Sequence, residues 1–530
     1  MMSTSGNSYI LAIDLGTSGA KVGLVSSRAE ILDWEFEATP LLLTRGGGAE
    51  QRPADWWAAI RAATRRLLDK RIVPVEEITA LSCSTQWSGT VPVDAGGEPL
   101  ANAIIWLDTR GARYVQRILR GPVNIQGYDP LKVLLTWIRL TAGAPARNGK
   151  DPIGHILFLK HEHPEIYQEA DLFLEPKDYI NLRLTGKAVA SYDSIAMHWL
   201  TDNRRIDRVA YDPRLFRLVG LQRAQFPELR RAVDILGPLS SQAAAELGLS
   251  TDTQVVVGSP DLHTTAIGSG AVRDFEPHLY VGTSSWICCH VPFKKTAVSS
   301  NICSVPSSIP DRYLVIDEQE WAAGCLNYVL DEVFYHPDEL ATGPKPDDPH
   351  EVLNRVAVEA PPGSERLIFT PWLYGERTPV DDAWVRGGFL NLSPNKTRAH
   401  LARAVFEGVA YNTRWMLEAV EGFVKRRLDG LHIVGGGAVS DLWCQIFADV
   451  LDRTIHQVRE PRQAPLRGAA CLALVALGRM TFDEVAACVE IEHTFQPDPQ
   501  NRQIYDDLYR EFVNLYKALR PIYARLNAVK

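Results

Sequence analysis

The hydrophobic positions along the chain predict short buried strands that alternate with amphipathic helices. Short apolar runs occur at residues 9–13, 22–25, 78–83, 91–93, 254–258 and 431–434. Runs of this kind are typical of buried strands. Residues 55–68 place apolar side chains at the spacing of one helical face, and residues 397–422 do so over a longer stretch. The alternation predicts an α/β fold.

Segments rich in glycine, alanine and proline mark the expected connections. Residues 139–152 are of this kind and are expected to form a surface connection, and residues 343–349 are expected to form a linker. Residues 266–275 should end a helix and cross into a second domain. A chain of 530 residues exceeds what one hydrophobic core usually supports. We therefore expect two domains followed by a charged helical tail.

The composition narrows the classes of protein to consider. The net charge is −8 and no cluster of lysine or arginine stands out, which argues against a nucleic-acid partner. No apolar run has the length of a membrane span, and no charged and then apolar leader opens the chain. The eight cysteines show no CxxC pair and no histidine-linked metal spacing. These features favour a cytoplasmic enzyme with no membrane partner.

The turn between the first two predicted strands combines groups that bind phosphate. It brings together a carboxylate, glycine amides, two hydroxyls and a lysine: Asp14, Gly16, Thr17, Ser18 and Lys21. Glycine lets the backbone approach an anion closely, and a carboxylate can hold a hydrated Mg²⁺ ion. A turn between two strands is usually only a hairpin. A second apolar–Gly-Thr-Ser–apolar turn at Gly282 and Thr283 favours a pair of turns that grip a polyphosphate.

Two further segments have a strand that ends in a turn. Asp261 follows the strand at 254–258, where it can either accept a proton from a substrate hydroxyl or simply cap the next helix. The strand at 431–434 runs into three consecutive glycines and then a helix start. Such glycines let a nucleotide lie on the backbone, although a glycine loop is more often just a turn.

A third group of residues has the character of a sugar site. Side-chain amides and carboxylates bind hydroxyls, and an indole covers the apolar face of a sugar ring. These types occur together at Gln86, Trp87, Ser88, Trp106, Asp108 and Arg110. For Trp106, Asp108 and Arg110 the alternative is a buried tryptophan beside an Asp–Arg pair on the surface.

Motifs of this kind follow one another over most of the chain. They lie at residues 14–18, 106–110, 237–239, 243–249, 258–261, 282–284, 375–379, 403–410 and 435–438. In this order the chain resembles the FGGY carbohydrate kinases of the actin/hexokinase/Hsp70 ATPase superfamily, and it looks closest to the xylulose kinase branch. The resemblance covers about residues 9–478.

The resemblance implies two RNase H-like domains with the active site in the cleft between them. Residues 1–270 would bind the sugar, the phosphates and Mg²⁺ and supply the catalytic base. Residues 271–485 would bind the nucleotide, and residues 486–530 would form a helical tail. The resemblance also allows a homodimer, because dimers are common in the family, but nothing in the sequence independently marks a dimer face.

The resemblance also assigns roles to individual residues. Asp261 would be the general base that activates a sugar hydroxyl for attack on the γ-phosphate of ATP. Asp14 would organise Mg²⁺ and the phosphates, with Thr17, Ser18 and Lys21 near the transferred group. The remaining contacts to ATP would come from the second turn and the glycine loop, through Gly282, Thr283, Gly436, Gly437 and Ala438.

The acceptor is where the chain departs from the family pattern. Xylulose kinases usually carry Gln-Met-His-Gly where this chain has Trp87 and Ser88 at the two central positions. His155 replaces an expected lysine, and Leu392 falls where glycine is preferred. Our hypothesis is a kinase for a ketopentose, with D-xylulose as the first compound to test.

Two alternatives remain open from the sequence. One is an FGGY kinase for another sugar, a polyol or a sugar acid, such as ribulose, glycerol, erythritol or gluconate. The other is an Hsp70-like or actin-like nucleotide switch that phosphorylates no metabolite. Against the switch, no peptide-binding β-domain or polymer-like extension follows the nucleotide core.

Overall fold

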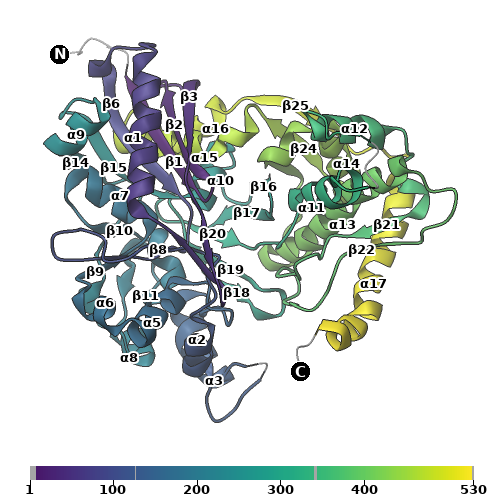
Figure 1. The fold of residues 1–530 in the computed structure, drawn as a ribbon, viewed down its shortest axis with the longest axis horizontal. Helices are drawn as coiled ribbons and strands as arrows, with labels where there is room; N and C mark the ends of the chain where they lie inside the picture. The colour runs from purple at the N-terminus through teal and green to yellow at the C-terminus, as the bar shows by residue number, and fades with distance from the viewer. Residues whose placement is uncertain (1–7, 126, 340–342, 528–530) are drawn as a thin grey trace.

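The computed structural model describes residues 8–125, 127–339 and 343–527 and shows two α/β halves, each built around a mixed sheet (Figure 1). The first sheet has the order β14 (Ile235–Pro238), β15 (Gln254–Pro260), β6 (Ile78–Thr85), β1 (Tyr9–Gly16), β2 (Gly19–Val25) and β3 (Ile31–Ala38). Strand β1 pairs antiparallel with β2 and parallel with β6. Helix α1 (Pro53–Asp69) packs its apolar face against this sheet, as its spacing predicted.

The second sheet repeats the arrangement of the first. Its order is β18 (Thr296–Ala297), β19 (Ile302–Pro306), β20 (Tyr313–Ile316), β17 (Ser285–Val291), β16 (Pro277–Val281), β23 (Gly430–Val434), β24 (Thr454–Val458) and β25 (Ile491–Phe495). The hairpin β16–β17 is antiparallel, and β16 pairs parallel with β23, as β1 does with β6. The expected repeat of a Gly-Thr-Ser turn between two strands is confirmed.

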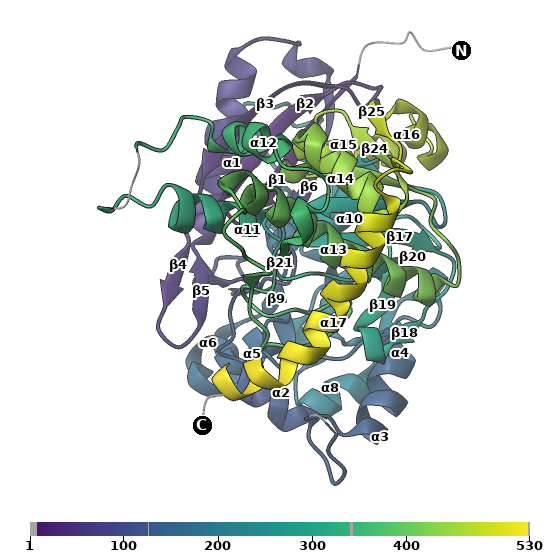
Figure 2. The same ribbon diagram turned by 90° about the vertical axis from the view of Figure 1, so that its right-hand side faces the viewer.

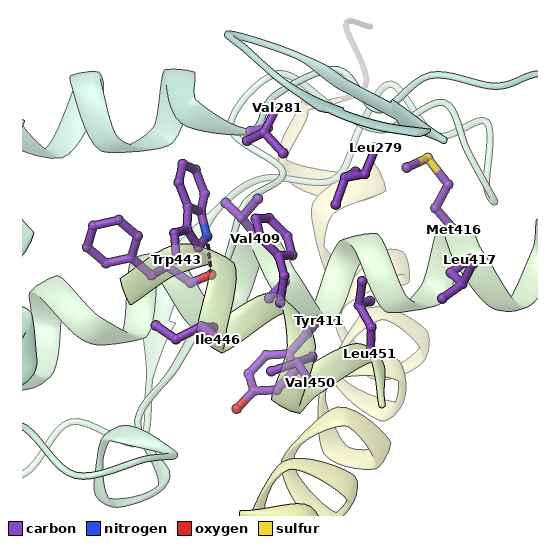
Figure 3. Close-up of a cluster of buried hydrophobic side chains, with 14 of the residues drawn as sticks. Leu279, Val281, Val409, Tyr411, Met416, Leu417, Trp443, Ile446, Val450 and Leu451 are labelled. Carbon is purple, nitrogen blue, oxygen red and sulfur yellow. Dashed lines mark hydrogen bonds between the residues drawn. The ribbon is translucent and has the colours of Figure 1, made fainter. Parts of the chain in front are cut away.

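The core of the second half lies between its sheet and two helices. Helices α13 (Arg398–Val424) and α14 (Asp441–Leu451) bring buried side chains against Leu279 and Val281 of β16 (Figure 3). The Trp443 indole N–H donates a hydrogen bond to the Phe406 carbonyl at 3.1 Å, which satisfies the one polar atom of that large side chain. This rigid core fixes the end of β16, where the second Gly-Thr-Ser turn begins.

Two helices connect the halves. Helix α10 (Asp261–Gly268) continues from β15 of the first sheet, yet its Ala266 packs against Cys288 and Leu314 of the second sheet. Helix α15 (Ala464–Ala476) comes late in the chain and packs against β1 and β6 of the first sheet (Figure 1). Each half therefore lends a helix to the other, and the two helices pack on each other.

A separate layer of helices covers one end of the first half. Helices α2 (Ala112–Leu119), α5 (Pro152–Glu162), α6 (Pro164–Glu169) and α8 (Pro213–Val219) share a buried cluster around Phe173, Trp199 and Phe226. Helix α7 (Pro176–Thr185) lies between this layer and the first sheet. Val305 of β19 joins the cluster, and the Tyr313 hydroxyl donates to the Asn203 carbonyl at 2.7 Å, so the layer also contacts the second half.

The remaining helices and strands are short or peripheral. The other helices are α3 (Pro130–Lys132), α4 (Arg139–Thr141), α9 (Ser241–Leu247), α11 (Ala323–Tyr328), α12 (Pro349–Val358), α16 (Phe482–Cys488) and α17 (Arg502–Asn527), the last of which runs along the outside of the second half (Figure 2). The small ladders are formed by β4 (Leu42–Thr44), β5 (Gly48–Gln51), β7 (Val91–Val93), β8 (Ala103–Ile104), β9 (Leu172–Leu174), β10 (Val189–Ser191), β11 (Thr201–Asp202), β12 (Ala210–Tyr211), β13 (Glu228–Arg230), β21 (Ile368–Thr370) and β22 (Gly388–Leu390).

Two local expectations need correction. The segment 139–152 is not a surface connection, because Thr141, Gly143 and Asp151 are buried and Asp151 accepts a hydrogen bond from the Trp199 indole. The segment that follows residue 485 is not purely helical, because β25 pairs with β24 at the edge of the second sheet before α17 begins. Within the described ranges, none of the helices has both the length and the apolar character that a bilayer span requires.

Candidate active site

The geometry of β15 places Asp261 at the junction of the two halves. Gly258 has φ = +72°, and a Cβ atom there would lie 2.4 Å from the Cys83 carbonyl oxygen of the neighbouring strand, so only glycine fits. The strand then ends at Pro260, and Asp261 opens α10 with its carboxylate accepting from the Leu262 N–H at 2.8 Å. The buried Asp193 carboxylate also holds the Ser259 hydroxyl. Asp261 is therefore held at a defined position.

The surroundings of Asp261 favour its protonated form. Burial first, and then the nearby Asp14 carboxylate, raise the pKa of Asp261 to about 7, with a further contribution from Glu318. The Leu262 N–H and the Lys21 ammonium oppose this pKa shift. A carboxyl group that titrates near neutral pH suits a general base, because it can accept a proton and release it again.

The first Gly-Thr-Ser turn lies beside Asp261. Gly16 and Gly19 close the β1–β2 hairpin, and the carboxylate of Asp14, two residues before it, lies 2.9 Å from the Lys21 ammonium. Asp14 also accepts from the Ser84 hydroxyl at 3.2 Å. Lys21 reaches across to the Arg462 carbonyl of the second half at 3.4 Å. The carboxylate and the ammonium thus face the space between the two halves.

Thr17 connects this turn to the predicted sugar site. Its hydroxyl donates to the Gln86 side-chain oxygen at 3.0 Å and accepts from the Trp106 indole N–H at 3.0 Å. The neighbouring Ser18 is exposed at the tip of the turn. Gln86 and Trp106 are therefore brought to the first Gly-Thr-Ser turn, although they come from distant parts of the sequence.

Trp87 and Ser88 lie on the other side of Gln86. The Trp87 indole donates to the Ser194 carbonyl at 2.9 Å, and its ring contacts the edge of His263, two residues after Asp261, at 5.1 Å between centroids. Ser88 is buried, with a left-handed φ of +60°. Trp87 thus forms a wall next to the helix that carries the candidate base.

Asp108 and Arg110 form a buried pair rather than a surface pair. The Asp108 carboxylate accepts from the Ala49 N–H, the Arg110 N–H and the Arg110 guanidinium, each at 2.9 Å. Arg110 also contacts Glu50 at 2.6 Å. These contacts fix the loop that carries Trp106, and Asp108 is fully buried.

The second Gly-Thr-Ser turn faces the same space as the first. Tyr280, two residues before Gly282, packs against the apolar cluster that contains Ile10 and Ala12 of β1 and Ile267 of α10. Burial and then the charges of Asp261 and Asp14 raise the pKa of this tyrosine. The carbonyls of Gly282 and Thr283 accept from the Ala323 and Ala322 N–H groups at 2.8 and 2.7 Å. The turn is therefore braced from behind by the start of α11.

The glycine loop packs directly onto the second turn. A Cβ atom at Gly435 would lie 2.6 Å from the Val281 carbonyl oxygen, and one at Gly437 would lie 2.5 Å from the Val281 side chain. Gly436 between them is exposed. Ala438 is buried, and its carbonyl accepts from Gln457 at 2.7 Å. The loop thus presents bare backbone at Gly436, between two glycines that pack on Val281 at the start of the second turn.

The structure adds charged residues that the sequence did not single out as site residues. Glu318 and Glu320 follow β20 and both contact the Arg377 guanidinium. The charges of all three act on the pKa of Lys150, which lies in the segment 139–152. No local pattern marks these positions, because they meet only when the two halves pack.

The comparisons with known proteins agree with this geometry. The family model described as the FGGY family of carbohydrate kinases, N-terminal domain, matches residues 9–268, and the model of the C-terminal domain matches residues 279–477. A xylulose kinase of Staphylococcus epidermidis is 29% identical over 525 residues, with 98% of each chain covered. A gluconokinase of Bacillus subtilis is 26% identical over 522 residues, again with 98% of each chain covered. The crystal structure of a ligand-bound xylulose kinase from Lactobacillus acidophilus has a TM-score of 0.85 at 25% identity and covers 98% of this chain and 100% of its own.

Proposed function

Because this chain belongs to the FGGY family of carbohydrate kinases, we propose that it transfers the γ-phosphate of ATP to a hydroxyl of a ketopentose such as D-xylulose. The chain is a carbohydrate kinase. The proposal adds the identity of the acceptor sugar. The similarity to a protein named xylulose kinase over nearly the full length supports this acceptor. The single observation that supports the proposed mechanism is the short chain of contacts between Asp14 and Asp261: the Ser84 hydroxyl donates to Asp14 at 3.2 Å and lies 2.8 Å from the Thr264 hydroxyl, which donates to the Asp261 carbonyl at 3.1 Å.

In this proposal Asp261 accepts the proton of the attacking sugar hydroxyl. With a pKa of about 7, the carboxylate is ionised in a large fraction of molecules at neutral pH. Its hydrogen bond to the Leu262 N–H orients one oxygen and leaves the other for the substrate. General-base catalysis of this kind contributes about 10²–10⁴-fold in rate.

The two turns would hold the phosphates of ATP. Thr17, Ser18 and Lys21 supply hydroxyls and a positive charge on one side, and the backbone of Gly282 and Thr283 lies on the other. Positioning and charge neutralisation are what phosphoryl transfer needs most. The adenosine would lie on Gly436, Gly437 and Ala438, where Gly436 leaves the backbone uncovered.

The chemistry of Asp14 fits a magnesium ion. Mg²⁺ is usually held by one or two carboxylates together with water and phosphate oxygens. Among the described residues no cluster of three or more metal-binding side chains occurs, so the single carboxylate of Asp14 agrees with this type of site. When bound, Mg²⁺ would neutralise charge on the phosphates, and Asp14 would hold it.

The sugar would lie between Gln86, Trp87 and Trp106. Gln86 and Trp106 are joined through the Thr17 hydroxyl, so they lie next to the phosphate turn. Trp87 offers an apolar wall and Ser88 takes the place of a histidine that is usual in xylulose kinases. Asp108 and Arg110 would act by fixing the loop of Trp106, since their side chains are engaged with the protein.

The test is a coupled assay of ADP release with pentuloses, polyols and aldonates as acceptors. Asp261→Asn should lower kcat about 10²–10⁴-fold while ATP binding, measured by calorimetry, stays close to that of the wild type. Asp252→Asn, at an exposed aspartate before the same strand, is the matched control and should retain full activity. Turnover of Asp261→Asn near the wild-type value would remove the assignment of the base, and the absence of any ketopentose activity would remove the acceptor.

A further inference from the structure

Lys150 is a charged side chain that makes contact with no charged group among the residues that the structure describes. Among the described residues, its ammonium makes neither a hydrogen bond nor an ion pair, and it lies 5.9 Å from the centroid of the Trp106 ring. The residue is only partly buried, so its ammonium can still meet a solute. Trp106 is the indole that binds the Thr17 hydroxyl. Lys150 therefore lies at the edge of the proposed sugar site.

The charged side chains that act on Lys150 belong to the second half of the molecule. Burial and then the Arg377 guanidinium lower the pKa of Lys150, whereas Glu320 and Glu318 act to raise it. Arg377 contacts both carboxylates. The side chains of Glu318 and Arg377 remain 30% and 22% exposed, so a small solute can reach them.

Glu318 links this group to the catalytic base. Its charge contributes to the raised pKa of Asp261 and also acts on Lys150. The contacts run from Lys150 over the Trp106 ring to the Thr17 hydroxyl and on to Gln86, and the neighbouring Trp87 ring lies 5.1 Å from His263 on the helix that begins with Asp261. A sugar whose hydroxyl faces Asp261 would extend toward Lys150.

The charges of Lys150, Arg377, Glu318 and Glu320 determine which chemical group of an acceptor sugar can bind near them. Lys150 and Arg377 carry two positive charges, and Glu318 and Glu320 carry two negative charges, so the four formal charges cancel. A sugar carboxylate would gain an ammonium but would face Glu318, and like charges in a partly desolvated site repel. A neutral carbonyl or hydroxyl oxygen can accept from the ammonium, and a hydroxyl can donate to the carboxylate.

We propose that Lys150 is a specificity-determining residue, which donates hydrogen bonds to the end of the acceptor sugar opposite to the hydroxyl that Asp261 activates. Together with Glu318 it selects an uncharged ketose over a sugar acid. The inference rests on the proposed kinase function and adds to it the recognition of the far end of the acceptor. It gives a role to a position that lies outside the motifs of the sequence.

Steady-state kinetics of the full-length enzyme with D-xylulose, D-ribulose and D-gluconate test the proposal. Lys150→Met should raise the KM for the preferred ketose about 10-fold or more, as expected when a hydrogen bond to a charged group is lost, and should leave the KM for ATP unchanged. Lys150→Arg keeps the positive charge and should restore most of the affinity. Lys517→Met, at an exposed lysine on α17, is the matched control and should behave as the wild type.

The outcomes separate this inference from the function on which it rests. A ketose KM of Lys150→Met within twofold of the wild type, an equal rise in the KM for ATP, or a wild-type preference for gluconate would overturn the inference while the kinase function stands. A wild-type enzyme that phosphorylates no sugar in the panel would remove both. Calorimetric ATP binding by Lys150→Met shows that the variant is folded, so a loss of ketose affinity is not a loss of structure.

Discussion

Asp261 combines two properties that oppose each other at the scale of a single residue. As the proposed general base it must be ionised to accept a proton, yet burial and then the charge of Asp14 favour its neutral form. The compromise is a pKa of about 7, which makes the group a stronger base than an ordinary aspartate while part of the population is still ionised at neutral pH.

The pH dependence of the reaction follows from this pKa. As the pH falls through about 7, Asp261 becomes protonated and kcat/KM for the sugar should fall, approaching a tenfold loss per pH unit well below the pKa. The profile should be measured at saturating ATP. Glu318→Gln removes one of the charges that raise the pKa of Asp261, so the acidic limb of its profile should move to lower pH. A limb that stays in place, or moves to higher pH, would show that another group controls the rate.

At the scale of an element, β15 owes its function to one backbone position. Gly258 and Gly186 have nearly the same left-handed φ, +72° and +73°. A Cβ atom at Gly258 would lie 2.4 Å from the Cys83 carbonyl oxygen, whereas nothing lies within 4 Å of one at Gly186. An alanine at either position would therefore suffer the same backbone strain. Only the alanine at position 258 would also clash with a neighbouring strand.

This pair gives a matched test of how β15 positions the base. Gly186→Ala should cost about 1 kcal/mol of stability, from the left-handed backbone alone, and keep its activity. Gly258→Ala should cost about 1–3 kcal/mol more, because its Cβ must displace the neighbouring strand, and kcat should fall with it. Thermal unfolding and the kinase assay measure the two effects. Equal losses in the two variants would mean that the contact with Cys83 is of no consequence.

The elements that the sequence predicted well are those fixed by local pattern. The β1–β2 hairpin follows from two apolar runs around a Gly-Thr-Ser turn, and its repeat at β16–β17 follows from the same pattern. Strand β25 was missed because only its end residues are partly buried, and it is a strand chiefly through its pairing with β24. The order of apolar and polar residues in β25 therefore does not by itself predict a strand.

The residues of the candidate site also fall into those that a local sequence pattern marks and those that it does not. Asp261, Asp14 and Thr17 lie within short motifs whose chemistry is local, so the sequence could single them out. Lys150 and Glu318 become neighbours only through the packing of the two halves, more than 100 residues apart in the chain. The burial of Asp108 was equally hidden, because it depends on the Ala49 N–H contributed by a distant strand.

At the scale of the whole molecule, the crossing of α10 and α15 joins the two halves. A Cβ atom at Gly268 would lie 1.8 Å from the Ala464 carbonyl oxygen, and one at Gly468 would lie 1.8 Å from the Thr264 carbonyl oxygen. The backbones therefore touch at this point, with no side chain between them. Because α10 also carries Asp261, the crossing sets the distance between the base and the second half.

A substitution at Gly468 tests the packing of the two halves on each other without changing the hydrophobic core of either half. Gly468→Ala forces the two helices apart, so we expect a loss of about 1–3 kcal/mol in stability and a fall in kcat, because Asp261 moves relative to the second Gly-Thr-Ser turn, which is proposed to hold the phosphates. Gly422→Ala is the control: this glycine is exposed within α13 with nothing inside 4 Å of a Cβ atom, and alanine there should raise stability by about 0.5–1 kcal/mol. Thermal unfolding and the kinase assay report on both variants. If Gly468→Ala lost stability but kept its full kcat, the crossing would serve folding alone, and the position of the base would have to be set within the first half.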